Sequence, residues 1–444
     1  MQNMVLCCIH MKKVRLFFKA LMNVRVTLRV AFFLAFRQIR RSSKWTTGLI
    51  IFIMMLTFLN LVVVSGLLVG LISGSYVQFR DHYAGDVLIT PAPGRTYIED
   101  SQDIVSYVKG LPEVETVSSR TSILAQVKGT LDENPKAKEK PNVSGGAIIG
   151  INPDEEEKLS EFSKFVLEGQ NLKNGEEGFI LIGANLIKEY STFGDVDIPG
   201  LELLKNIKVG DRVRVSIETE AGPAEKDVIV KGIMKSKVDQ ISQRYFMVDK
   251  ELRRMLPANR LELQEIAIKS KPDMGRLVAD DVMAHFNNPR VRVQTYQEAI
   301  PSFLRDIETT FGILGNFLSS FGLILACITV FIVVFINAVN RRKYIGILKG
   351  IGVEPRVITL AYVCQAVFYG VAGATIGLVI TFGLLKPFFE RNPINFPFSD
   401  GILVATLDGS LLRVGILLFV TILAGFIPAY MIVRKNTLDS ILGR

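Results

Sequence analysis

The stretch NRRKYIGILKGIG, Asn340 to Gly352, decides how the rest of this chain is arranged. It is short, basic and amphipathic, and a long apolar run lies on each side of it. We expect a helix on the cytoplasmic face of a membrane, with an apolar side presented to a partner. The side chains presented are Ile345, Ile347, Leu348 and Ile351. If a partner pushes on this helix, a large domain on the other side of the membrane would respond.

Four apolar segments are long enough to cross about 30 Å of hydrocarbon, which takes roughly 20 helical residues. They are Thr47–Ile72, Thr310–Asn337, Thr359–Leu385 and Leu411–Val433. The whole chain agrees with this interpretation, because 49% of its 444 residues are hydrophobic and its mean hydropathy is +0.32. That is more apolar than a soluble protein usually is, so we predict a membrane protein with four transmembrane helices.

The distribution of charge predicts the orientation in the membrane. The net charge is +9, and residues 1–46 hold ten Lys or Arg and no acid. The loop Arg341–Arg356 has five basic residues against Glu354 alone. The positive-inside rule places both segments, and therefore both termini, in the cytoplasm of a multi-pass protein of the cell membrane.

The predicted fold class is an α-helical membrane protein with a large α+β extracytoplasmic domain, residues 75–305, between helices 1 and 2. Alternating apolar and polar residues predict a β-rich insert at about 160–250. Residues near 80 should pair with residues near 295, because both ends enter the same membrane. The remaining segments are 1–46 (cytoplasmic, basic and amphipathic), 47–72 (helix 1), 310–337 (helix 2), 340–358 (cytoplasmic coupling helix), 359–385 (helix 3), 386–410 (extracytoplasmic loop), 411–433 (helix 4) and 434–444 (cytoplasmic tail).

Glycines spaced for one helix face predict close packing between transmembrane helices. Helix 1 carries Gly66, Gly70 and Gly74, and helix 3 carries Gly370, Gly373 and Gly377. Asn60 is polar in mid-span, and we expect it to hydrogen-bond to a neighbouring helix.

The N-terminal residues 24–44 alternate arginines with apolar side chains, which is typical of a helix lying in the membrane interface. Trp45 marks the membrane edge. A solvated basic tail is the alternative, and binding to nucleic acid is not needed to explain the charge. Met11 could be the true start in place of Met1.

The sequence lacks the motifs of the common catalytic sites. It has no G-x-x-x-x-G-K-[ST] phosphate loop, no G-x-S-x-G elbow and no H-E-x-x-H. His10, His82 and His285 lie too far apart to suggest a metal site. Acidic residues such as Glu155 and Glu157 are expected on a solvated surface. We predict no catalytic, cofactor or metal residues, and a chain that is not an enzyme.

Several of these pieces resemble one family. RRKYIGILKGIG at Arg341–Gly352, the glycine-rich third span, and Ile427-Pro428-Ala429 followed by Asn436–Leu442 are similar to FtsX-like permeases. The order of one span, a large outer domain and three spans is also similar. The outer pieces Gly150–Pro153, Leu167–Gly169 and Lys208–Asp211 resemble the lipoprotein-releasing and macrolide-exporter branches.

The resemblance implies a membrane subunit of a mechanotransmitting ABC transporter that exports or releases a lipoprotein, peptide or drug-like molecule. ATP would be used by a separate ABC ATPase, and the permease would be a homodimer or a heterodimer. An extracytoplasmic cargo or adaptor and membrane lipids are further partners. The residues that would couple to the ATPase are Arg341, Arg342, Tyr344, Ile345, Gly346, Ile347, Leu348, Lys349, Gly350, Ile351 and Gly352.

Two positions depart from the family pattern. Tyr344 stands where Glu is usual, and Gln365 stands where the third span usually has an acid. Two other functions remain open: a transmembrane regulator that activates a cell-wall hydrolase, and a membrane-anchored receptor that needs no ATPase. The sequence does not name the cargo.

Overall fold

The computed structural model describes residues 26–129, 142–191, 194, 202–219, 222–257, 262–396 and 399–434. The chain divides into two compact units, which we call the helical unit and the β-rich unit. The helical unit is Met1–Gly70, Glu308–Ile394 and Gly401–Arg444, and the β-rich unit is Leu71–Ile307 and Asn395–Asp400.

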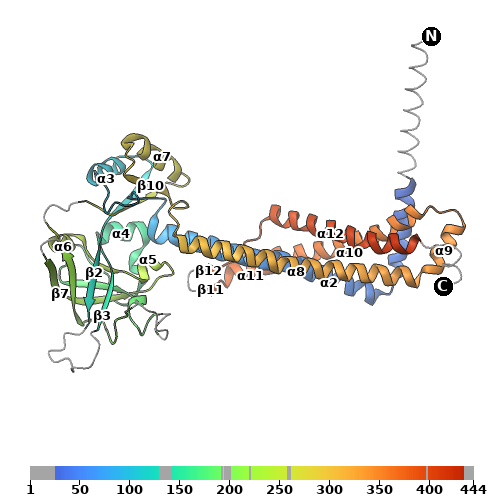
Figure 1. The fold of residues 1–444 in the computed structure, drawn as a ribbon, viewed down its shortest axis with the longest axis horizontal. Helices are drawn as coiled ribbons and strands as arrows, with labels where there is room; N and C mark the ends of the chain where they lie inside the picture. The colour runs from blue at the N-terminus through green and yellow to red at the C-terminus, as the bar shows by residue number, and fades with distance from the viewer. Residues whose placement is uncertain are drawn as a thin grey trace, which may run out of the picture. The chain divides into compact units, whose positions relative to one another are not determined.

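Among the described residues, four helices are long and apolar enough to cross a membrane, and the four predicted spans fall within them. The helices of this part of the chain are one over residues 26–40, α2 (Lys44–Phe79, continued by η1, Arg80–Ala84), α8 (Ser302–Asn340), α9 (Arg342–Gly350), α10 (Pro355–Ile380, continued by η4, Thr381–Leu385, and α11, Lys386–Arg391) and α12 (Leu407–Val433). The helix over residues 26–40 and α9 lie at the same end of the helical unit (Figure 1).

One of these helices is much longer than a membrane requires. α8 has 39 residues, which rise by about 58 Å at 1.5 Å per residue. The hydrocarbon core is only about 30 Å thick. Roughly half of α8 must therefore lie outside it, and its first turns carry the charged residues Arg305, Asp306 and Glu308.

The glycine face of α2 packs against an extended segment and not against another helix, so the sequence prediction needs correction here. A Cβ at Gly70 would overlap the carbonyl oxygen of Ile402, and one at Gly66 would lie 2.9 Å from the carbonyl oxygen of Val404. The backbone N–H of Val404 donates to the carbonyl of Gly66 at 3.1 Å. Gly74 likewise faces Ser399 and Asp400, on strand β12 (Ser399–Gly401).

The glycines of α10 do allow helices to approach one another. A Cβ at Gly373 would lie 2.6 Å from Met54 Cβ of α2, and one at Gly377 would overlap the ring of Phe58. Gly370 faces α12 in the same way. Asn60 is a further correction, because its buried side-chain oxygen has no hydrogen-bond partner among the described residues.

The close approach at Gly70 can be tested with a matched pair of substitutions in α2. We expect Gly70→Ala to lower the stability of the full chain by about 1–3 kcal/mol, the usual cost of overpacking. A Cβ at Gly48 would have no neighbour within 4 Å, so Gly48→Ala should leave the stability unchanged or raise it slightly. The thermal unfolding midpoint in detergent measures both, and equal midpoints for the two variants would contradict the packing.

In the part of the chain that the structure describes, the β-rich unit is built on ten strands. They are β1 (Val87–Pro91), β2 (Val114–Lys128), β3 (Val143–Ile151), β4 (Val166–Gly169), β5 (Phe179–Gly183), β6 (Arg212–Thr219), β7 (Gly222–Met234), β8 (Tyr245–Val248), β9 (Glu265–Ser270) and β10 (Val291–Thr295). A short pair, β11 (Ile394–Phe396) and β12, stands apart from this sheet. The helices of the unit are α3 (Ser101–Lys109), α4 (Pro153–Ser160), η2 (Phe162–Phe165), η3 (Ala184–Leu186), α5 (Asp239–Ser242), α6 (Asp249–Arg254) and α7 (Gly275–Phe286).

Six of the strands pair in a closed ring, in the order β2, β6, β7, β5, β8, β3 and back to β2. Alternate residues point into it, so Ile180 and Ile182 belong to the interior cluster while Leu181 faces a second core. The ring needs β2 and β3 and therefore extends beyond the β-rich insert expected at 160–250. Closure leaves few unpaired strand edges, which protects this part of the chain from edge-to-edge association.

The other end of β2 pairs with β9, which continues the sheet to β1 and β10. α3 and α7 lie close together beside β10 and share an apolar cluster with these strands (Figure 1). Val87 of β1 pairs with Thr295 of β10, which confirms the predicted pairing of the two ends of the domain.

Candidate functional site

α9, inside the stretch that opened the sequence analysis, has a buried inner side. Ile345 is only 2% exposed and belongs to the apolar cluster that contains Ala338 of α8, Ile358 of α10 and Ile432 of α12. Leu348, one turn later, is half-buried against the same cluster. Gly346 is also buried. These residues hold α9 on the bundle, so the expectation that Ile345 and Leu348 face a partner needs revision.

The outer side of α9 is exposed and apolar. Tyr344, Ile347 and Ile351 are 69%, 52% and 72% exposed. Their spacing of three and four residues places them in one stripe along the helix, which we call the α9 stripe. Lys343 is exposed beside it, and Arg341 and Arg342 are half-buried. An exposed apolar stripe at the end of a transmembrane bundle, next to basic residues, is typical of a surface that binds another protein or a membrane.

The end of α9 is fixed by its backbone. Gly352 has a φ of +93°, its N–H donates to the carbonyl of Lys349, and the N–H of Val353 donates to the carbonyl of Leu348, each at 3.0 Å. This is the Schellman arrangement, in which glycine takes the left-handed position just beyond the helix. Val353 and Leu348 pack on the same cluster, as the motif requires. The turn leads directly to Pro355, the first residue of α10.

The remaining sequence-predicted positions lie apart from this surface. Gln365 is buried in α10 and donates from its amide nitrogen to the hydroxyl of Tyr369 at 2.8 Å. The six glycines predicted to pack helices lie on α2 and α10, as described above. The part of the chain that the structure describes holds no group of three His, Cys, Asp or Glu that could bind a metal.

A second feature, which the sequence analysis missed, is a buried cluster of charges in the β-rich unit. Arg120 of β2 is 1% exposed, and its guanidinium donates to Glu156 of α4 at 2.5 and 3.0 Å. The same guanidinium donates to the carbonyl of Tyr83 at 2.8 Å and lies 4.3 Å from the centre of its ring. The hydroxyl of Tyr83 donates to Glu265 of β9, which also accepts from Arg244 at 3.1 Å.

This cluster joins η1, where α2 ends, to four separate parts of the β-rich unit: β2, α4, β9 and Arg244, which directly precedes β8. Burial raises the pKa of Glu265, but Arg244 and Arg120 outweigh that effect and hold its pKa below the ordinary value. Burial lowers the pKa of Arg120, but Glu156, Tyr83 and Glu265 together outweigh the effect of burial, and the pKa lies above the ordinary value. The cluster therefore holds two cations and two anions, and its net charge is near zero.

One signal in the sequence does point to this cluster. The buried residues of α4 are Pro153, Glu156, Leu159 and Ser160, so Glu156 lies on the apolar side of its helix. Glu155 and Glu157, in contrast, bind the partly exposed Lys109 and the N–H of Ser163. Steps of three residues from Pro153 to Leu159 pass through Glu156, so the helical period would have placed this acid, and not Glu155 or Glu157, on the apolar side of the helix.

The charge of Glu265 gives this cluster a testable pH dependence. Because its pKa is depressed on folding, its contribution is present above its ordinary pKa of 4.5 and is lost as the pH falls through the folded value. At pH 7, Glu265→Gln should lower the free energy of unfolding by about 3–5 kcal/mol, because it leaves buried arginines uncompensated. The gap in the free energy of unfolding between wild type and variant should narrow below pH 4.

Unfolding of the full chain in detergent, followed by near-ultraviolet circular dichroism at several pH values, measures this gap. Asp280→Asn is the matched control, because Asp280 pairs with Arg276 at the surface. Its effect should be small at every pH. A gap for Glu265→Gln that stays constant from pH 7 to pH 3 would contradict the electrostatic account.

Comparison with known proteins identifies the region that contains α9. Residues 316–437 match the family model described as FtsX-like permease C-terminal. This region is therefore similar to the C-terminal domain of FtsX-like permeases. It contains most of α8 and all of α9, α10 and α12, so the resemblance drawn from Arg341–Gly352 is confirmed there. The FtsX-like domain thus carries both the buried side of α9 and the α9 stripe.

A comparison with curated proteins gives no match. Among solved structures, the chain is similar to the extracellular domain of the noncanonic ABC-type transporter YknZ from Gram-positive bacteria, with 11% identity and a TM-score of 0.30. The match covers 47% of this chain and 99% of that one. The periplasmic region of MacB from Actinobacillus actinomycetemcomitans matches with 11% identity and a TM-score of 0.32, over 49% of this chain and 92% of that one.

Proposed function

We propose that this chain is the membrane subunit of an FtsX-like ABC transporter that passes motion from a cytoplasmic ATPase to an extracytoplasmic domain. The observation that carries the proposal is the α9 stripe within the FtsX-like domain. The outer side of α9, which carries the stripe, is exposed in the described part of the chain and can bind another protein. The inner side of α9 is buried against α8, α10 and α12. A force applied to the stripe would therefore reach three helices at once.

The proposed path continues along the two helices that belong to both units. The division between the units falls within α2, after Gly70, and within α8, after Ile307. α2 continues as η1, where Tyr83 is held by Arg120 and by Glu265. A displacement of η1 would act on β2, α4 and β9 together, because the buried charges resist separation.

In this proposal the β-rich unit faces outward and exports or releases a lipoprotein, a peptide or a drug-like molecule. The chain itself catalyses nothing and binds no cofactor, and ATP is hydrolysed by a separate ABC ATPase. Two copies, or one copy with a related permease, form the working assembly in the cell membrane. The absence of a phosphate-loop motif from the sequence supports the assignment of ATP hydrolysis to another chain.

The proposal predicts that the α9 stripe binds the ATPase. Ile347→Asp combined with Ile351→Asp should abolish co-purification of an ABC ATPase with the tagged full chain, because both side chains are exposed and their replacement leaves the bundle intact. Leu124→Asp is the matched control, since Leu124 is 77% exposed on β2 and should retain the ATPase. Mass spectrometry of the purified material gives the readout. Retention of the ATPase by the α9 variant, or ATP hydrolysis by the purified chain alone, would refute the proposal.

The proposal also predicts which side of the membrane two exposed lysines, Lys343 and Lys158, face. In a background with the four cysteines replaced by serine, Lys343→Cys should react with a membrane-impermeant maleimide only after the cells are permeabilised. Lys158→Cys, on α4, should react in intact cells. The reverse pattern would place α9 outside the cell and would exclude a cytoplasmic ATPase as its partner.

A further inference from the structure

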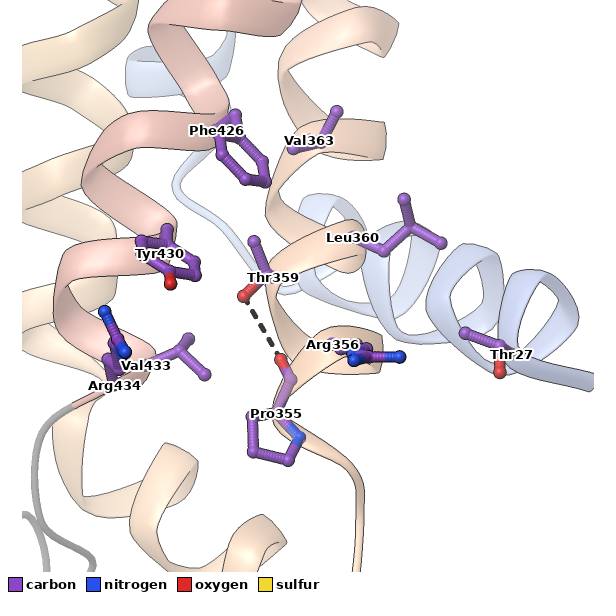
Figure 2. A pocket seen from close by; sticks show the side chains of 10 residues that line it. All are labelled: Thr27, Pro355, Arg356, Thr359, Leu360, Val363, Phe426, Tyr430, Val433 and Arg434. Carbon is purple, nitrogen blue, oxygen red and sulfur yellow. Dashed lines mark hydrogen bonds between the residues drawn. The ribbon is translucent and has the colours of Figure 1, made fainter. Parts of the chain in front are cut away.

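A cavity of about 420 Å³ opens at one end of the helical unit, where α10 begins and α12 ends (Figure 2). Three elements line it: the helix over residues 26–40, the first turns of α10 and the last turns of α12. Its volume lies within the range of small-molecule pockets, about 300–1,000 Å³.

The lining changes from charged to apolar along the helices. Arg356 lies in the first turn of α10, and Arg434 directly follows α12. Val363 and Phe426 lie seven or eight residues further into these helices, which corresponds to a depth of about 10–12 Å. Figure 2 shows the two arginines on different sides of the cavity and Val363 beside Phe426 at its inner end. The cavity thus combines a cationic mouth with an apolar interior, which matches an amphiphile.

Arg356 and Arg434 are the charged side chains among the residues that line the cavity. Thr359 donates its hydroxyl hydrogen to the carbonyl of Pro355 at 3.1 Å (Figure 2). Arg434 lies 5.3 Å from the centre of the Tyr430 ring. No ion pair joins Arg356 or Arg434 to an acid among the described residues, and no acid lines the cavity. The mouth therefore favours an anion.

The third wall also suits a membrane surface. On the helix over residues 26–40, Ala31 is buried with Val357 and Ala361 of α10, while Phe32 and Phe33 are 67% and 60% exposed. Thr27 of this helix closes the cavity beside Arg356. A helix that binds the bundle on one side and exposes aromatic rings on another is suited to the interface of a bilayer. The cavity then lies at the depth of the lipid head groups.

We propose that this cavity binds one anionic phospholipid. Its head group lies at the mouth, in the field of Arg356 and Arg434, and one acyl chain runs inward along Leu360, Val363 and Phe426. Basic pockets between transmembrane helices suit anionic head groups, and a basic residue near the membrane surface attracts them without direct contact. The bound lipid would tie the N-terminal helix to α10 and α12.

The test uses the full chain, purified in detergent and titrated with phosphatidylglycerol or with phosphatidylcholine of the same acyl chains. Native mass spectrometry counts the lipids bound. The wild-type chain should hold one phosphatidylglycerol that phosphatidylcholine does not replace. Arg356→Gln with Arg434→Gln should weaken this binding by about 25-fold, roughly fivefold for each arginine. Arg391→Gln, at the end of α11, is the matched control and should bind as the wild type does.

A second variant tests the interior without changing the charge. Val363→Trp should fill the cavity and remove the tight phosphatidylglycerol, while far-ultraviolet circular dichroism shows the same helix content. Equal binding of the two lipids, or unchanged binding by both variants, would overturn the proposal. So would competition by glycerol phosphate, which has no acyl chain. A several-fold gain on deleting residues 435–444 would show that the tail of this chain is the occupant. No ATPase takes part, so the result is independent of the proposed transport function.

Discussion

The burial of Ile345 is the constraint on which the helical unit depends. α9 is only nine residues long, and an isolated helix of that length is not stable in water. It persists because Ile345 and Leu348 pack on the apolar cluster of the bundle and because Gly352 ends the helix with two backbone hydrogen bonds. The same packing leaves Tyr344, Ile347 and Ile351 on the outer side. One short helix thus serves both as part of the bundle and as an exposed surface.

The β-rich unit uses a different kind of contact to hold η1. Arg120, Arg244, Glu156 and Glu265 are charges taken out of water, and a pair of this kind adds little stability over well-packed apolar residues. Its value lies in geometry, because each guanidinium hydrogen must point at a particular oxygen. Apolar side chains would permit η1 to slide against β2 and β9, whereas the charges favour one position. This rigidity suits the role proposed for the junction, in which a displacement of η1 would be passed on to the strands.

The sequence predicted those features that depend on composition and period. The four spans follow from the length of apolar runs, and the pairing of β1 with β10 follows from both ends entering one membrane. The closed ring was not predicted. In the sequence β2 looks like a single strand, but its two halves pair with different partners. For Gly66 and Gly70, the spacing revealed a close approach but not its partner, the extended segment at Ile402 and Val404. The buried side of α9 depends on the neighbours of Ile345, which no local pattern specifies.

The position of the lipid cavity connects it to α9 through the backbone. Val353 ends the Schellman turn and packs both on the cluster of Ile345 and beside Val357 and Ala361, which hold the helix over residues 26–40. Only Glu354 separates Val353 from Pro355, a wall of the cavity. A ligand that fixes the first turn of α10 would therefore restrict the turn that ends α9. The membrane itself would then set how firmly α9 is held, because the occupant of the cavity comes from the bilayer around it.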